Sequence, residues 1–81
     1  MDQDAIKAKI IKVMALILEV DSSDINDESS MDTIDAWDSL KHMKLVVALE
    51  QELEVEFEDK EVVELLNLRL IELTVAEKLV R

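Results

Sequence analysis

The chain contains neither glycine nor proline among its 81 residues, and this absence constrains the fold more than any other feature. Strand-rich folds usually need one or both residues in their turns, and a glycine-rich phosphate-binding loop is impossible without glycine. Leu, Val, Ile, Ala, Glu and Lys are abundant. This length supports one small domain with one modest core. The sequence therefore predicts a single all-α domain over residues 1–81.

Two segments with helical periodicity predict the first two helices. The first runs from Asp4 to Leu18 and the second from Ser39 to Leu53. The buried stripe of the first consists of Ile6, Ile10, Val13, Met14 and Ile17. The main stripe of the second consists of Leu40, Met43, Val46, Val47 and Leu53. Leu45 and Leu49 widen the second stripe, which predicts a central helix contacted by several others.

The C-terminal part of the chain predicts two further helices. Residues 55–58 alternate between apolar and acidic side chains, as a short extended linker would. A third helix is expected to start near Asp59 and to continue toward Leu66, without a clear end. Thr74 and Glu77 match the capping box, which predicts a last helix from Val75 to the end. The expected architecture is a four-helix bundle.

A long polar loop is expected between the first two helices, from Glu19 to Trp37. Ile25 and Ile34 are the apolar residues expected to anchor it to the core. Its acidic residues invite comparison with a calcium-binding EF-hand loop, which needs glycine at its sixth position. Counted from Asp24, that position is Ser29, so the pattern fails. No specific metal site is predicted, and only loose, low-affinity binding of divalent cations by the carboxylates is left open.

The net charge of −11 limits the partners of the chain. Nucleic acid and anionic membrane surfaces are disfavoured because their phosphates would be repelled. No apolar run approaches the roughly 20 residues of a membrane span, and the N-terminal residues lack the apolar stretch of a signal peptide. The absence of cysteine excludes disulfides and thiolate chemistry, and it is compatible with the cytoplasmic location that we expect.

Asp38, Ser39 and His42 are the residue types of a hydrolytic triad, but their spacing argues against catalysis. Ser39 and His42 lie one turn apart on one predicted helix, and no nucleophile elbow is visible. His42 is the sole histidine and has no clear metal-ligand partners, so a partly exposed helical position is expected. Trp37 is expected to pack into the junction of loop and helix, although its pairing with His42 makes an imperfect hydrophobic staple.

Ser39 follows a good N-cap residue, Asp38, at the start of the second helix. Its hydroxyl therefore lies at the positive end of the helix dipole, where backbone amides lack helical acceptors. Such a serine suits either a capping role or the attachment of a phosphate-containing group. Residue types alone leave both interpretations open.

The central block of the sequence resembles the acyl carrier protein family. The shared pattern is Asp38-Ser39-Leu40 at the start of the second of four helices, after a long loop in a small acidic chain. The closer similarity is to stand-alone bacterial carrier proteins, in which a segment like residues 29–40 precedes His42 and a block like residues 45–50. More loosely, the resemblance extends over nearly the whole chain.

The resemblance implies a carrier function and no catalytic activity of the chain itself. A phosphopantetheinyl transferase would move 4′-phosphopantetheine from coenzyme A onto Ser39, flanked by Asp38 and Leu40. The terminal thiol of the arm would then hold an acyl group as a thioester. Partner enzymes would include a loading ligase and acyl-using transferases or synthases. The residues expected to line an acyl cleft are Leu45, Val46, Leu65 and Leu66.

Several positions depart from the family pattern. Ala36 stands where glycine is often found two residues before the Asp. Lys41 and Lys44 stand where many fatty acid biosynthesis carriers have acidic residues, whereas Glu50 and Glu52 keep the acidic character. These four charged residues are expected to contact partners, on a face of mixed charge that disfavours ordinary fatty-acid synthase enzymes. Thr74 also lies farther from the serine than expected, so residues 66–73 are expected to extend the third helix or its following loop.

Three functional hypotheses follow. The first is a monomeric acyl carrier protein in a lipid, polysaccharide or secondary-metabolite pathway. The second is an aminoacyl or peptidyl carrier, which shares the arm and differs in cargo. The third is a helical interaction module in which Ser39 only contributes to the start of a helix.

Overall fold

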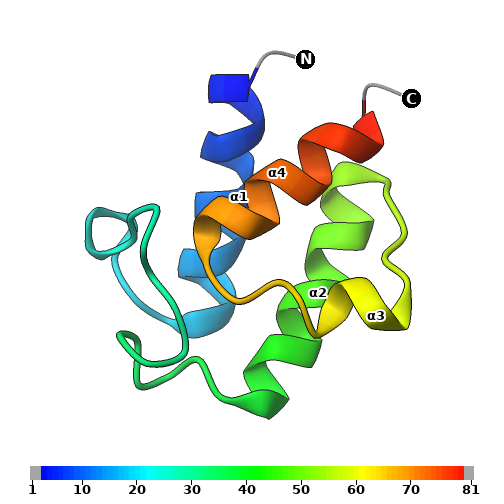
Figure 1. Ribbon diagram of the computed structural model, residues 1–81. Helices are drawn as coiled ribbons and strands as arrows, with labels where there is room; N and C mark the ends of the chain where they lie inside the picture. Colours follow the sequence, from blue (N-terminus) through cyan, green and yellow to red (C-terminus); the bar gives the residue numbers. More distant parts are fainter. Residues whose placement is uncertain (1–2, 80–81) are drawn as a thin grey trace.

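The computed structural model describes residues 3–79 as an α-helical domain (Figure 1). Its helices are α1 (Gln3–Leu18), α2 (Ser39–Leu53), α3 (Asp59–Val62) and α4 (Leu68–Leu79), with a short 3₁₀ turn η1 (Ser22–Asp24) in the first connection. Both α2 and α4 pack against α1. The predicted all-α architecture with a long first loop is confirmed, but α1 rather than α2 is the central helix.

The buried face of α2 differs from the predicted stripe. His42, Leu45, Val46, Leu49 and Leu53 are buried. Leu40, Met43 and Val47 are instead 65%, 53% and 49% exposed. Because α2 is apolar on much of its circumference, its periodicity alone did not identify which side faces the core. The prediction was therefore wrong for Leu40, Met43 and Val47, which form an apolar surface beside Ser39. It is confirmed for the other apolar positions of the predicted stripe, which are buried.

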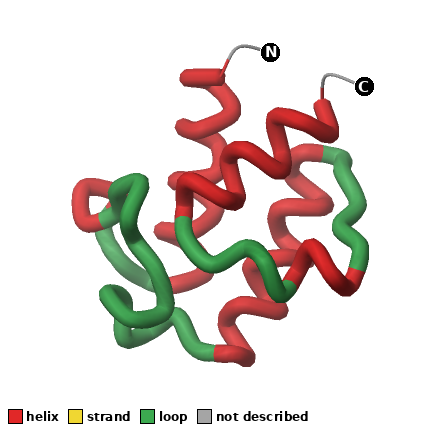
Figure 2. The backbone as a smooth tube through the Cα atoms, viewed as in Figure 1, coloured by secondary structure: helices red, strands yellow, loops and turns green. Residues whose placement is uncertain are grey.

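The loop between α1 and α2 is folded against the start of α4 (Figure 2). The Leu68 amide donates to the Ser29 carbonyl and the Arg69 amide to the Asp27 carbonyl, both over 3.2 Å. These bonds satisfy amides that have no acceptor within their own helix. Ile25, Ile34 and Trp37 are buried, which confirms the predicted anchoring of the loop.

The last helix starts earlier than the predicted Val75. Asn67 Oδ1 accepts the Leu70 amide over 2.9 Å, as an N-cap side chain does, and α4 begins at Leu68. Thr74 lies inside this helix, so the predicted capping box was wrong. The predicted extension of the third helix or its following loop over residues 66–73 was wrong, because residues 68–73 form the first half of α4.

The third helix is shorter than predicted. It starts at Asp59 as expected, where Glu58 and Glu61 form a capping box, and it ends at Val62. Residues 63–67 then connect it to α4, and within this connection Leu65 is 1% exposed. The predicted linker over residues 55–58 is confirmed.

The ends of α1 and α2 use glutamate where many helices use glycine. Glu19 and Glu54 follow the two helices with φ angles of 57° and 56°, in the left-handed region. The Val20 amide donates to Ala15 and the Val55 amide to Glu50, as in the Schellman motif. A chain without glycine must form these turns with residues that carry a Cβ atom.

Candidate functional site

The start of α2 presents Ser39 to solvent. Asp38 is the N-cap residue, with φ −102° and ψ −176°, and its carboxylate accepts the Lys41 amide over 2.9 Å. Ser39 is the first residue of the helix and is exposed, and the first turn contains no acidic side chain. A group attached to the Ser39 hydroxyl therefore meets the positive end of the helix dipole.

His42 lies one turn further along α2 and is buried, not partly exposed as predicted. The Trp37 Nε1–H group donates to His42 Nδ1 over 3.0 Å, and His42 Nε2 lies 2.9 Å from the Val62 carbonyl oxygen. The two rings stack with centroids 5.9 Å apart. Trp37 thus packs at the junction as predicted, and its pairing with His42 combines a hydrogen bond with ring stacking.

These contacts determine the tautomer of His42. The indole of Trp37 can only donate, so Nδ1 of His42 must be the acceptor. The hydrogen of the neutral ring is then on Nε2, and this Nε2–H group donates a hydrogen bond to the Val62 carbonyl oxygen. Both nitrogens are engaged, and the Asp38 carboxylate caps the helix. Asp38, Ser39 and His42 are therefore not arranged as a hydrolytic triad, because the histidine has no nitrogen available for the serine.

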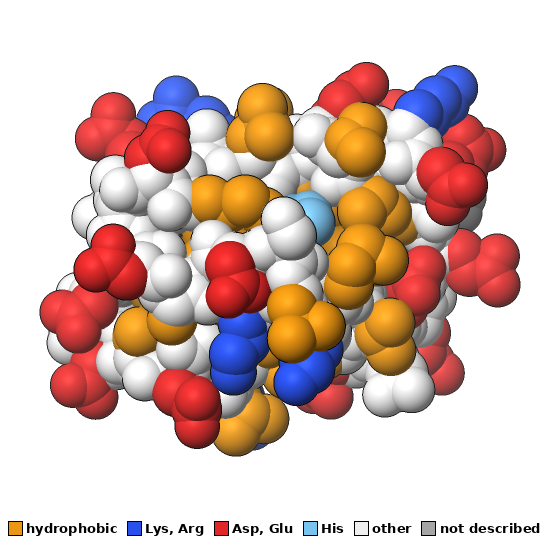
Figure 3. All heavy atoms as spheres, turned by 90° about the horizontal axis from the view of Figure 1, so that it is seen from below, with side chains coloured by type: hydrophobic (Ala, Val, Ile, Leu, Met, Phe, Trp, Pro, Cys, Tyr) orange, Lys and Arg blue, Asp and Glu red, His pale blue; other side chains and the backbone are white. Residues whose placement is uncertain are grey.

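An apolar groove of about 310 Å³ begins beside Ser39. The other residues that line it are Met31, His42, Met43, Val62, Val63, Leu65 and Leu66. Figure 3 shows apolar side chains around the sole histidine of the chain, with acidic side chains mainly toward the margins of this face. An apolar substituent near Ser39 would be partly shielded from water in this groove.

The groove contains two of the four residues that the sequence predicted for an acyl cleft. Leu65 and Leu66 line it, but Leu45 and Val46 do not, because they are 0% and 4% exposed within the core. The spacing of the helix could have identified His42 and Met43, which lie three and four residues after Ser39. Met31 and Val62 come from distant segments, and no local signal in the sequence connects them with Ser39.

A second apolar hollow, of about 460 Å³, lies on the outer side of α2. It is lined by Ile17, Leu40, Met43, Lys44, Val47, Ala48 and Gln51. Met43 belongs to both hollows, so the apolar surface continues around α2 from the groove. Contiguous exposed apolar surface of this kind often marks a protein-interaction site.

The four charged residues predicted to contact partners have different surroundings. Lys41 Nζ donates to the Ile17 carbonyl over 3.3 Å and lies 3.4 Å from Glu19 Oε2. Glu50 Oε2 accepts the Phe57 amide over 2.9 Å. Lys44 and Glu52 are exposed. Lys41 and Glu50 therefore hold the fold together, whereas Lys44 and Glu52 are available at the surface.

An ion-pair cluster holds the first loop between α1 and α4. Lys7 Nζ lies 2.7 Å from Asp27 Oδ1, and Arg69 Nη2 lies 3.9 Å from Asp27 Oδ2. The hydrogen bond from Lys7 lowers the pKa of Asp27. The same hydrogen bond raises the pKa of Lys7. This cluster stabilises the loop that leads to Ser39.

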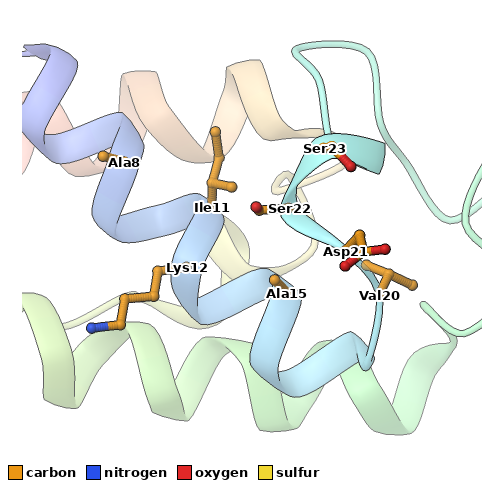
Figure 4. Close-up of a pocket in the computed structure, with 8 residues that line it drawn as sticks. All are labelled: Ala8, Ile11, Lys12, Ala15, Val20, Asp21, Ser22 and Ser23. Atoms are coloured by element: carbon orange, nitrogen blue, oxygen red, sulfur yellow. The ribbon is translucent and has the colours of Figure 1, made fainter.

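Another hollow, of about 680 Å³, lies between α1 and η1 (Figure 4). Its lining shares no residue with the groove beside Ser39. The charged ends of Lys12 and Asp21 point away from each other (Figure 4), so they form no common binding site.

Among residues 3–79, no group of three His, Cys, Asp or Glu side chains could hold a metal ion. Within the same range, no helix is long and apolar enough to cross a membrane.

Comparison with protein families gives one match that covers most of the chain. The model of the phosphopantetheine attachment site family matches residues 8–75. Members of this family carry a covalently attached 4′-phosphopantetheine group, and these carrier domains are not catalytic themselves. The matched region includes all of α2 and α3 and most of α1 and α4. The chain therefore belongs to the phosphopantetheine attachment site family, which is consistent with its resemblance to acyl carrier proteins.

Proposed function

We propose that the chain is an acyl carrier protein and that Ser39 is its attachment residue. The single observation that supports this most strongly is an exposed serine at the start of α2, beside an apolar groove, in a chain of this family. When attached, 4′-phosphopantetheine supplies a terminal thiol that holds an acyl group as a thioester. A phosphopantetheinyl transferase would attach the arm, using coenzyme A and Mg²⁺.

The residues around Ser39 fit a phosphodiester. The first-turn amides of α2 point toward this end of the helix without helical acceptors, and the dipole favours an anion there. Asp38 orders the turn by accepting the Lys41 amide, so Ser39 is held at the first helical position. In the attachment step, the Ser39 oxygen would bond to phosphorus, while its proton passes to the transferase and 3′,5′-ADP leaves.

The groove favours an acyl cargo over an aminoacyl one. Its lining consists of methionine, valine and leucine side chains together with Ser39 and His42, and it contains no carboxylate. An aminoacyl group carries an ammonium ion, which would lose its hydration in such a groove without gaining a carboxylate partner. An apolar acyl chain would be stabilised there by the removal of its surface from water. Aminoacyl or peptidyl cargo remains the second candidate, since the attachment site is common to both.

Partner enzymes would bind the exposed side of α2 next to Ser39. Leu40 and Val47 offer apolar area, while Lys44 and Glu52 offer charges of both signs. A partner complementary to this surface would need an acidic group opposite Lys44. We therefore propose loading and acyl-using enzymes of a specialised lipid, polysaccharide or secondary-metabolite pathway. We expect the carrier to act as a monomer in the cytoplasm, where coenzyme A is present.

The test is the intact mass after incubation with coenzyme A, Mg²⁺ and a promiscuous phosphopantetheinyl transferase. We expect wild-type protein to gain one phosphopantetheine and Ser39→Ala to gain none. Ser23→Ala is the matched control, because Ser23 is also exposed but lies in η1, and it should be modified like the wild type. Folded, unmodified wild-type protein that gains no mass would contradict the carrier function and favour a helical interaction module.

A further inference from the structure

The end of the short helix α3 and the connection that follows it form one wall of the groove, and α3 has little stability of its own. It contains four residues and none of them is buried. A single helical turn is unstable in isolation, because nucleation fixes several residues for few hydrogen bonds. Its position must therefore come from contacts with the rest of the domain.

Two polar contacts connect α3 with neighbouring helices. On the side of α4, Lys78 Nζ lies 2.8 Å from Glu61 Oε1. On the side of α2, His42 Nε2 lies 2.9 Å from the Val62 carbonyl oxygen. The latter bond joins α2 directly to the last residue of α3, so it connects the two sides of the groove.

The bond to Val62 requires a particular proton position on His42, and Trp37 sets it. A neutral imidazole carries its proton on either nitrogen, but only the Nε2–H form can donate to a carbonyl from Nε2. Trp37 Nε1–H faces Nδ1 at 3.0 Å, and a proton on Nδ1 would leave two donors opposed. Trp37 and His42 are 1% and 8% exposed, so water cannot readily relieve that conflict.

We propose that His42 is a positioning residue that fastens α3 to α2 and thereby sets the width of the groove, with Trp37 fixing its tautomer. Val62, Val63, Leu65 and Leu66 line the α3 side, and Met43 lines the opposite side with His42. The width set in this way determines how well an apolar chain is shielded. This last consequence rests on the carrier function proposed above, whereas the fastening of α3 does not.

The first experiment measures amide hydrogen exchange on the unmodified protein, so it is independent of any cargo. His42→Ala removes both contacts, His42→Asn retains an acceptor near Trp37, and His42→Gln retains a donor that can reach Val62. We expect exchange at residues 61–65 to accelerate about two- to tenfold in His42→Ala and His42→Asn, the effect of one hydrogen bond. His42→Gln should stay close to the wild type, and amides 10–14 of α1 should change little in all three.

Exchange that rises equally in α1 and α3 would show a general loss of stability and overturn the proposal. Unchanged exchange in α3 of His42→Ala would overturn it as well. Trp37→Phe tests the role of the tautomer separately. Without the indole donor, the hydrogen of the neutral His42 ring can be on either nitrogen, so only part of the population keeps the bond to Val62. Exchange in α3 should therefore accelerate, but by less than in His42→Ala. Exchange in this variant identical to the wild type would exclude the role of Trp37.

The second experiment compares the hydroxylamine cleavage rates of octanoyl and acetyl thioesters on the loaded carrier. The acetyl group is too short to use the groove, so the ratio of the two rates isolates shielding from the chemistry of the arm. We expect octanoyl cleavage to be slower than acetyl cleavage in the wild type and in His42→Gln, with the difference reduced in His42→Ala. Equal ratios in wild type and His42→Ala would refute the control of groove width. Failure to load Ser39 would refute the carrier function alone, since the exchange experiment still decides whether His42 fastens α3.

Discussion

Lys41 Nζ donates to the main-chain oxygen of Ile17 over 3.3 Å, although Lys41 stands two residues after Ser39 on a different helix. The contact places a cation at the C-terminal end of α1, where the helix dipole is negative. It connects α1 with the start of α2. Lys41 therefore belongs to the framework of the site, and the neighbouring Lys44 is the cation available to partners.

Replacing each of these lysines by methionine should separate the two roles. Lys41→Met should lower the free energy of unfolding by about 1 kcal/mol, since it removes a charged donor from a helix end. Lys44→Met should leave stability nearly unchanged. Lys44→Glu should slow loading by a partner enzyme several-fold, and added salt should reduce the difference. Equal stability of the two methionine variants in thermal unfolding would contradict this division.

Asn67 and Thr74 offer a direct test of where the last helix begins. Asn67→Ala should cost about 1 kcal/mol, because it removes the side chain that accepts the Leu70 amide. Thr74→Ala should change stability by less than about 0.5 kcal/mol, since Thr74 lies inside α4 and alanine favours helix. Urea unfolding of both variants would measure this. A larger loss of stability in Thr74→Ala than in Asn67→Ala would instead indicate a capping box at Thr74.

Asp27 should make the stability of the domain depend on pH. Its pKa is lowered from the ordinary value of 3.8, chiefly by the hydrogen bond from Lys7, so its ionised form favours the folded state. The resulting stability is present above that ordinary value and is lost as the pH falls through the lowered pKa. Asp27→Asn should therefore reduce the melting temperature at neutral pH, and the reduction should disappear in acid.

Asp32→Asn is the matched control for this substitution, because Asp32 is exposed in the same loop and the change in net charge is equal. It should not reduce the melting temperature at neutral pH. An equal effect of both substitutions would show that Asp27 acts only through the overall charge of the chain.

Glu54 provides a stabilising substitution. Its φ of 56° is costly for a residue with a Cβ atom and readily adopted by glycine. Glu54→Gly should raise the free energy of unfolding by about 1 kcal/mol. Glu54→Ala removes the same charge but keeps the Cβ atom, so it should show no comparable gain. Denaturant unfolding that gives equal values for the two variants would exclude backbone strain as the cause.

Local signals in the sequence determined much of the fold. The lack of glycine and proline predicted helices, and the periodic apolar residues located α1 and α2 to within about a residue. Asp38 could be identified as an N-cap because capping involves atoms three residues apart. The same local signal indicated Ser39 as a candidate for attachment.

Tertiary structure decided the features that depend on distant partners. The amides of Leu68 and Arg69 find their acceptors in the first loop, so the start of α4 has no complete local signature. His42 is buried because Trp37 and Val62 satisfy its two nitrogens. The sequence shows no partner for this histidine, and a polar side chain without partners is expected to be exposed. Similarly, only packing selected which apolar side of α2 is buried, and this choice placed Met43 in the groove with Leu65 and Leu66. Short-range hydrogen bonds and periodicity can be read along a chain, whereas burial and long-range pairing exist only after the helices have come together.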